Sequence, residues 1–220
     1  MGVVPIVYRG KGNLTATYEF SDIASGAGYI NFYAGKPSSG YMLSSSTFYS
    51  DVLYTGTSTN AADYTKIVDV DFDCLMNKPI TLQGIGYVQV SYHYMNTNAA
   101  GDFYVIVRAR KWNGASETEL GLSTASAVKH AAVPGTDYTA TAGCNMTIAS
   151  AGIKSGEYLR LTVEGWARNT GGGGNTSYMD ILHDPMGRTP GTLGWTSATP
   201  STLIFQCPVR IDLYCQAILI

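Results

Sequence analysis

Apolar and polar side chains alternate with a period of two along much of this chain, as in strands that bury one face. Residues 67–74 show this most clearly, because the even-numbered positions are apolar or cysteine and Asp69, Asp71 and Asp73 lie between them. Residues 158–164 alternate in the same way. No window of eleven or more residues has the apolar repeat of a helix. The pattern therefore predicts an all-β protein.

Turn residues separate the predicted strands. Residues 102–112 and 115–122 flank Asn113-Gly114, a dipeptide that favours a type I′ hairpin turn. With on the order of ten such strands, the expected architecture is an antiparallel two-sheet β-sandwich, and the jelly roll is its favoured form.

Two irregularities are expected within the strands. Gly84 and Gly86 predict a bulge in the long strand over residues 80–95. Pro208 cannot donate a ladder hydrogen bond, so the final strand should lie at an edge or contain a bulge there.

The chain is expected to form a single domain over residues 1–220, because no linker divides it and no internal repeat is visible. Residues 1–12 are interpreted as an N-terminal arm. Residues 214–220 are interpreted as an apolar C-terminal tail.

Charged residues make up only 14% of the chain, whereas about 25% is usual for soluble domains. The net charge of −2 argues against a nucleic-acid partner. Apolar runs are far shorter than the ~20 residues that cross a bilayer, so no membrane association is predicted. A hydrophobic content of 45% with so little charge favours a surface covered by neighbouring subunits.

Both ends of the chain carry apolar side chains that would be exposed in a free subunit, and exposed apolar patches often mark interfaces. The predicted interface residues are Val3, Val4, Ile6, Tyr8, Tyr214, Ala217, Ile218, Leu219 and Ile220.

Three carboxylates form the most suggestive local pattern. Asp69, Asp71 and Asp73 should project from one face of a strand about 7 Å apart, and such a column is a candidate Ca²⁺ site. The alternative is a solvated face or salt bridges to Arg108 and Arg110 on another strand. No cofactor is predicted apart from this candidate calcium ion.

Catalytic signatures are weak. His93, His130 and His183 lie in unrelated segments, and no G-x-S-x-G elbow is present. His183 and Asp184 form a possible catalytic or ligand pair at a strand end, although Asp-Pro more often begins a turn. Glycosidase carboxylates would have to come from Glu164, Asp180 and Asp184. The expectation from these residues is that the protein is not an enzyme.

Aromatic side chains offer a different kind of site. Trp195 in a Pro- and Gly-rich loop and Tyr178 on a predicted strand are candidates for stacking on sugar rings. Core filling or subunit packing is the alternative role for such residues.

Several segments resemble small virion structural proteins of tailed bacteriophages and related viruses. They are EFSDIASGAGYINFYAG, RARKWNGASETEL, EYLRLTVEGW, LHDPMGR and the strand ending PVRIDL. The likeness spans most of the chain, but its motifs are turns and strands rather than catalytic signatures.

The resemblance implies a capsid decoration, or cement, protein that stabilises the shell through subunit interfaces. It implies a homo-oligomer, with a trimer favoured, and the major capsid protein or other virion proteins as partners. The expected location is the virion, assembled in the host cytoplasm. A carbohydrate-binding β-sandwich module or host-surface adhesin is the alternative.

Overall fold

The computed structural model describes residues 16–17, 27–98, 100–171, 175–188 and 201–210. These residues contain no helix, hence none that could cross a membrane. They form thirteen strands, which confirms the all-β prediction. The strands are β1 (Ala16–Thr17), β2 (Ala27–Gly35), β3 (Met42–Ser44), β4 (Tyr54–Thr59), β5 (Thr65–Leu75), β6 (Ile80–Asn96), β7 (Gly101–Trp112), β8 (Glu117–Leu122), β9 (Lys129–Ala131), β10 (Tyr138–Ile153), β11 (Tyr158–Asn169), β12 (Ser177–Leu182) and β13 (Leu203–Arg210).

All thirteen strands belong to one hydrogen-bonded sheet, whose main order is β4-β12-β6-β13-β2-β3-β5-β11-β7-β8. β1 adds to β2, β10 to β6 and β9 to β7. Neighbouring strands are antiparallel except at β3 and β5, which meet in parallel at Met42 and Asp73. The result is a single mixed sheet among the described residues, rather than the two separate antiparallel sheets that were expected.

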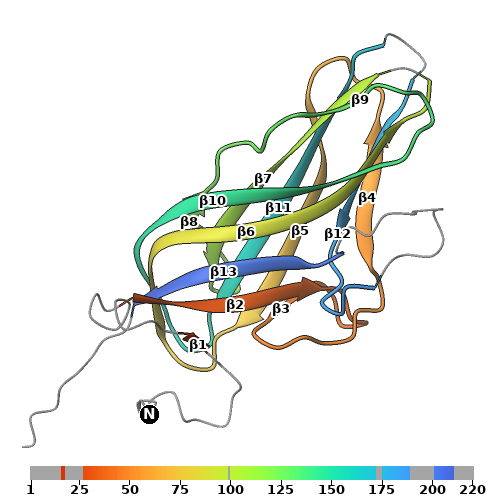
Figure 1. Cartoon of the computed structure of the whole chain (residues 1–220). Helices are drawn as coiled ribbons and strands as arrows, with labels where there is room; N and C mark the ends of the chain where they lie inside the picture. Colours follow the sequence, from red (N-terminus) through yellow and green to blue (C-terminus); the bar gives the residue numbers. More distant parts are fainter. Residues whose placement is uncertain (1–15, 18–26, 99, 172–174, 189–200, 211–220) are drawn as a thin grey trace, which may run out of the picture.

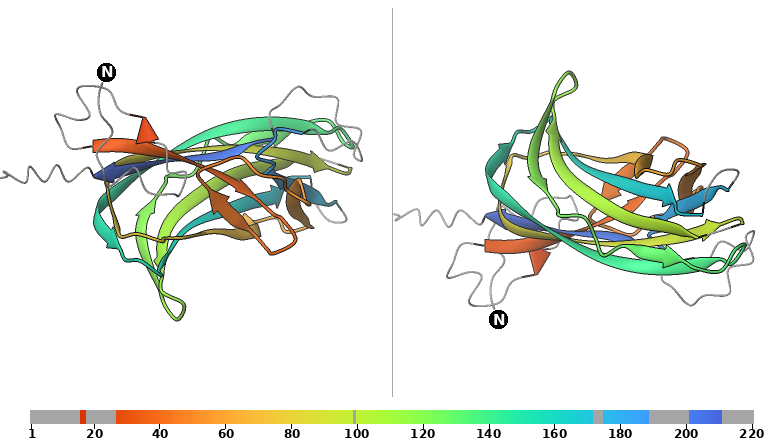
Figure 2. Two further views of the ribbon diagram at one scale, coloured as in Figure 1. Left: turned by 90° about the horizontal axis from the view of Figure 1, so that it is seen from below. Right: turned by 90° about the horizontal axis from the view of Figure 1, so that it is seen from above.

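The sheet curls so that two walls face each other (Figures 1 and 2). The front wall consists of β2, β13, β6 and β10, and the back wall of β5, β11, β7 and β8. β3 joins the walls along one edge. A bridge between Ser123 and Met146 links their other edges.

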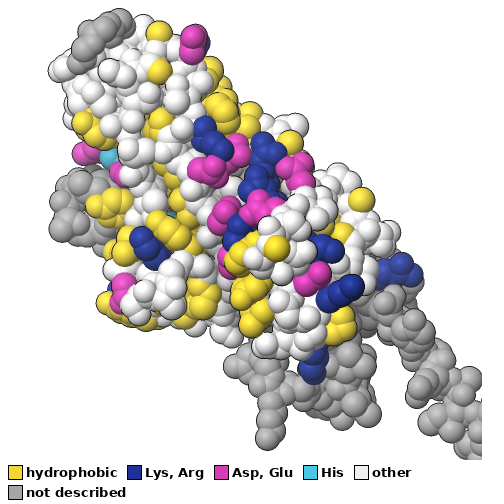
Figure 3. All heavy atoms as spheres, turned by 180° about the vertical axis from the view of Figure 1, so that it is seen from behind, with side chains coloured by type: hydrophobic (Ala, Val, Ile, Leu, Met, Phe, Trp, Pro, Cys, Tyr) yellow, Lys and Arg dark blue, Asp and Glu magenta, His cyan; other side chains and the backbone are white. Residues whose placement is uncertain are grey.

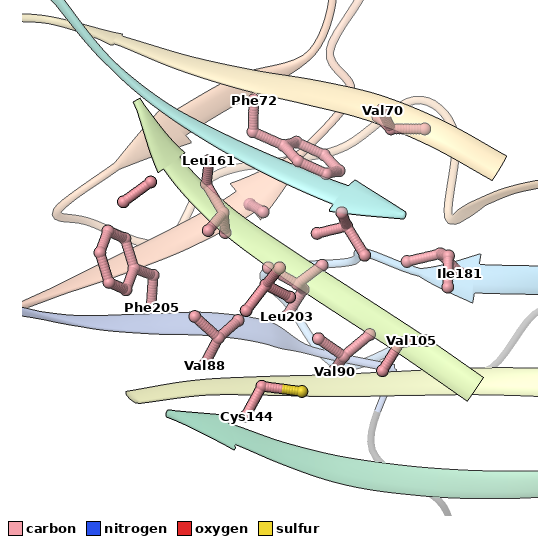
Figure 4. Packing of buried hydrophobic residues seen from close by; sticks show 14 of the residues in the cluster. Val70, Phe72, Val88, Val90, Val105, Cys144, Leu161, Ile181, Leu203 and Phe205 are labelled. Atoms are coloured by element: carbon pink, nitrogen blue, oxygen red, sulfur yellow. The ribbon is translucent and has the colours of Figure 1, made fainter. Parts of the chain in front are cut away.

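Apolar side chains from both walls fill the space between them (Figure 4). Val88 and Phe205 of the front wall and Phe72 and Leu161 of the back wall are at most 1% exposed. They occupy inward-facing positions, which alternate with outward-facing positions along each strand. The period of two in the sequence therefore matches the burial in the structure.

The hairpin at Asn113 forms, but its turn differs from the expected type. Trp112 pairs with Glu117, so four residues connect β7 and β8. The side-chain oxygen of Asn113 accepts hydrogen bonds from the backbone amides of Ala115 and Ser116. Among the described residues only glycines have positive φ, so Asn113 cannot adopt the type I′ conformation.

The predicted bulge occurs beside Gly84, whose φ of 127° favours glycine. Opposite it, the register of β10 shifts between Ile148 and Ala151. The pairing of β13 with β6 is also interrupted, between Gln206 and Val209, which is where Pro208 lies. The interruption tolerates the missing donor of proline and confirms the expected bulge in this central strand.

Candidate functional site

The outer face of the front wall has a groove of about 470 Å³. This volume lies within the range of pockets that hold small ligands, about 300–1,000 Å³. Its outward-facing lining residues are Tyr87, Gln89, Thr141, Gly143, Asn145, Ile204 and Gln206.

Strand register explains how residues from distant segments meet in this groove. One row crosses the wall as Asn145, Tyr87, Gln206 and Asn31, each the pairing partner of the next. A second row crosses two residues along each strand. It consists of Gly143, Gln89, Ile204 and Tyr33.

The groove is uncharged. All of its lining residues are neutral, and their side-chain polar groups are three amides and the hydroxyls of Tyr87 and Thr141. The rings of Tyr29 and Tyr87 lie 6.3 Å apart between centroids, within contact range for aromatic pairs. No atom lies within 4 Å of where a Cβ on Gly143 would be, so there is free space above the backbone of the groove at that point.

Charged side chains gather instead on the outer face of the back wall (Figure 3). Arg160 of β11 donates two hydrogen bonds of 2.7 Å to Asp73 and lies 3.2 Å from Asp71. Asp71 also accepts a hydrogen bond from Thr162, and Asp69 pairs with Lys66. The three aspartates of the predicted calcium column are therefore each paired with a cation.

These contacts agree better with the alternative of salt bridges than with a calcium site. The main cation beside the aspartates is Arg160, however, and not Arg108 or Arg110. Arg110 lies 3.9 Å from Asp71, and Arg108 pairs with Glu119 and Glu164. In the described part of the chain, no three His, Cys, Asp or Glu side chains form a group that could hold a metal ion. The calcium site stays a prediction.

Replacing Arg160 with methionine is expected to lower the free energy of unfolding by about 2 kcal/mol, because hydrogen bonds to charged groups each contribute about 1.5–3 kcal/mol. The Arg160 side chain is only 12% exposed and also stacks on Trp112. Lys66→Met is the control, since its ion pair with Asp69 is exposed and contributes at most about 1 kcal/mol, and Glu164, which lies 3.7 Å from Lys66, keeps its closer partner Arg108. Urea denaturation of both variants gives the comparison. Equal losses would contradict the central role of Arg160.

His183 is the most buried titratable group of a polar chain at one end of the sheet. Its Nε2 lies 2.9 Å from Thr55 Oγ1, and the Tyr41 hydroxyl lies 2.8 Å from the same oxygen. Lys36 Nζ donates to the Tyr41 hydroxyl over 3.3 Å. Pairing of β12 with β4 creates this contact, since His183 directly follows β12 and Thr55 belongs to β4.

Burial disfavours the charged imidazolium and lowers the pKa of His183 to about 4. The imidazole is therefore neutral near pH 7. In the tautomer that carries its proton on Nδ1, Nε2 accepts the hydrogen bond of Thr55. A hydroxyl beside an unprotonated imidazole is the minimal arrangement for activating an oxygen nucleophile.

The predicted pairing of His183 with Asp184 is not among the contacts of the structure. Asp184 accepts hydrogen bonds from the backbone amides of Met186 and Arg188 and pairs with the Arg188 side chain. Asp184 therefore stabilises the turn that follows it, which was the alternative role considered for the Asp-Pro dipeptide. Glu164 contacts Arg108, and Asp180 contacts His93, so the three carboxylates considered for glycosidase chemistry each have their own partner.

The other two histidines have carboxylate partners. His93 Nδ1 lies 3.0 Å from Asp180, and its Nε2 lies 2.8 Å from Asp137. Burial opposes the charged form of His93, but the hydrogen bonds to both carboxylates outweigh it and raise its pKa. His130 pairs with Asp102. Both histidines act as ties between strands.

Of the two proposed sugar-stacking residues, the structure describes only Tyr178. Tyr178 is 38% exposed on β12 but is outside the groove. Trp195 lies outside the described residues, as do the predicted interface residues at positions 3–8 and 214–220. These assignments stay predictions.

Sequence reasoning did not single out the groove amides or the partners of His183. The groove residues could have been found from the outward positions 87 and 89, 141–145 and 204–206 of three predicted strands, where amides, hydroxyls and an aromatic occur without a charge. Thr55 gives no comparable signal, because 128 residues separate it from His183.

No protein-family model and no curated protein matches this sequence. Solved structures do resemble the fold. A CocE/NonD family hydrolase from Staphylococcus aureus has a TM-score of 0.52 at 12% identity, covering 84% of this chain and 37% of that one. An α-amino acid ester hydrolase has a TM-score of 0.52 at 10% identity, covering 83% and 36%. An aminopeptidase from a marine sediment archaeon, Thaumarchaeota, has a TM-score of 0.52 at 7% identity, covering 84% and 37%.

At these identities the likeness shows the fold. The chain spans little more than a third of the length of the hydrolases that it matches.

These neighbours correct the virion prediction. Four solved structures that match this chain at TM-scores of 0.50–0.52 are hydrolases and an aminopeptidase, not capsid proteins. The decoration role, the capsid partners, the trimer, the virion location and the expectation of no enzymatic activity are therefore wrong. The physical reason is that the motifs behind the resemblance are strands and turns, which report a fold shared by proteins of unrelated function.

Proposed function

We propose that this chain is the β-sheet part of a hydrolase that acts on ester or amide bonds. The observation that supports it is the likeness of 83–84% of the chain to hydrolases at TM-scores of 0.50–0.52. Two of these structures are an α-amino acid ester hydrolase and an aminopeptidase, whose names denote action on ester and amide bonds.

The Thr55–His183 pair is the proposed reaction centre. The 2.9 Å contact lies within the 2.6–3.2 Å over which a base can take a proton from a nucleophile. Lys36 and Tyr41 continue the polar chain from Thr55 and supply donors that can stabilise negative charge on a reacting oxygen.

The proposed step balances as an acyl transfer. Thr55 Oγ1 forms a bond to the acyl carbon while its proton moves to His183 Nε2. The bond from the acyl carbon to the leaving oxygen or nitrogen breaks, and the leaving group takes that proton. Water then cleaves the acyl-threonine ester, which restores the hydroxyl and releases the acid.

Hydrolysis of p-nitrophenyl esters and amino-acid p-nitroanilides by the full chain tests the proposal. We expect Thr55→Val and His183→Gln each to lower kcat/KM more than tenfold. Thr57→Val is the matched control, because Thr57 lies exposed on the same strand and pairs with Met179. Thermal melting shows whether each variant is folded. No turnover by the native chain, or turnover that survives both substitutions, would contradict the proposal.

The finer architecture is also a proposal. We infer that the two walls act as the two sheets of a jelly-roll sandwich, with β3 as a local link. The single parallel pair between Met42 and Asp73 supports this, because so short a bridge adds little to either wall. A crystal structure in which β3 pairs with β2 but not with β5 would give two separate sheets, as expected. A longer β3–β5 ladder would contradict it.

A further inference from the structure

The groove on the front wall lies on strands that contribute neither Thr55 nor His183. Its lining comes from β6, β10 and β13, whereas the polar chain of His183 comes from β4 and the ends of β2, β3 and β12. The groove is therefore a separate feature from the proposed reaction centre.

The groups in the groove define the chemistry of a ligand. Gln89, Gln206 and Asn145 each present an amide, which can both donate and accept hydrogen bonds. Tyr87 is 44% exposed and adds an aromatic ring to the same lining. A matching ligand must carry many hydroxyl groups and a flat apolar face.

The absence of charged residues in the groove further restricts the class of ligand. The groove has no cation to pair with a phosphate, sulfate or carboxylate and no anion to pair with an amine. The arginines and aspartates of the back wall lie on the opposite face and are engaged with one another. A charged ligand would lose hydration in the groove without a compensating ion pair.

We propose that the outer face of the front wall is a binding site for a neutral oligosaccharide. A sugar ring stacks on Tyr87, and its hydroxyls bond to Gln89, Gln206 and Asn145. The open space over Gly143 admits the ring next to the strand. This site is independent of the proposed hydrolysis at Thr55 and involves neither Tyr178 nor Trp195.

Filling the groove tests the site without removing a contact. Gly143→Phe places a ring in the open space, and no atom lies close enough to the new Cβ to strain the fold. Gly152→Phe is the matched control, because Gly152 is also on β10, is exposed and has equally open space, but is not part of the groove.

The full chain is applied to an array of neutral and anionic oligosaccharides, and the best neutral ligand is then titrated by calorimetry. We expect Gly143→Phe and Tyr87→Ala each to weaken binding at least tenfold, and Gly152→Phe to change it less than twofold. Binding of no neutral oligosaccharide, preference for anionic ones, or equal affinity of the Gly143 and Gly152 variants would overturn the proposal. Ester hydrolysis measured in the same variants should not change, which separates this site from the reaction centre.

Discussion

Replacing Phe72 with alanine is expected to lower the free energy of unfolding by about 3–5 kcal/mol, the usual cost of removing a buried phenylalanine. Phe72 is fully buried on β5. Its ring lies 5.5 Å from that of Tyr41 and 5.4 Å from that of His183, edge to face in both contacts. The substitution therefore leaves a cavity next to the proposed reaction centre. Urea denaturation measures the loss.

Phe205→Ala separates the effect on the core from the effect on His183. Phe205 is equally buried but packs against Phe32 on the front wall. Both variants should lose similar stability. Only Phe72→Ala should let water reach His183 and raise its pKa from about 4 towards 6.5, which an NMR titration of the histidine resonances detects. An unchanged His183 pKa in Phe72→Ala would show that the ring does not shield it.

The strands could be predicted from the sequence because the alternation that marks them is local. Residues 67–74 were expected to form a strand, and β5 spans Thr65–Leu75. The bulge at Gly84 and the irregularity at Pro208 also follow from the residues themselves, since one permits unusual φ and the other lacks a donor.

Strand order could not be predicted in the same way. The contact of β3 with β5 and the position of β12 between β4 and β6 depend on pairing between segments far apart in the chain. The alternation of apolar residues says which face of a strand is buried, but not which strand lies beside it. The single mixed sheet was therefore outside the reach of the pattern.

The contacts of the candidate site could not be predicted for the same reason. His183 was visible as a histidine at a strand end, and its nearest acid, Asp184, was the natural partner to consider. The structure instead brings Thr55 to it across β4 and β12. The virion prediction failed for a related reason, because motifs of strands and turns carry the fold without identifying its use.

Acid is expected to destabilise the protein through His183. Its pKa is about 4 in the folded chain and about 6.5 when unfolded. Between these values the unfolded chain binds more protons, so stability falls as pH falls. With 1.36 kcal/mol per pH unit, the loss reaches about 3 kcal/mol near pH 4. Urea denaturation at a series of pH values from neutral to acid measures this slope.

His183→Gln should remove that slope, because its amide can bond to Thr55 but does not titrate in this range. His93 acts in the opposite direction. Its carboxylate partners raise its pKa, so its contribution is complete below pH 6.5 and is lost as pH rises through the folded value. His93→Gln should therefore lower stability by a constant amount below pH 6.5, remove the decline in stability as pH rises above 6.5, and leave the acid slope intact. If the acid slope persisted in His183→Gln, the burial of a neutral imidazole would not be its source.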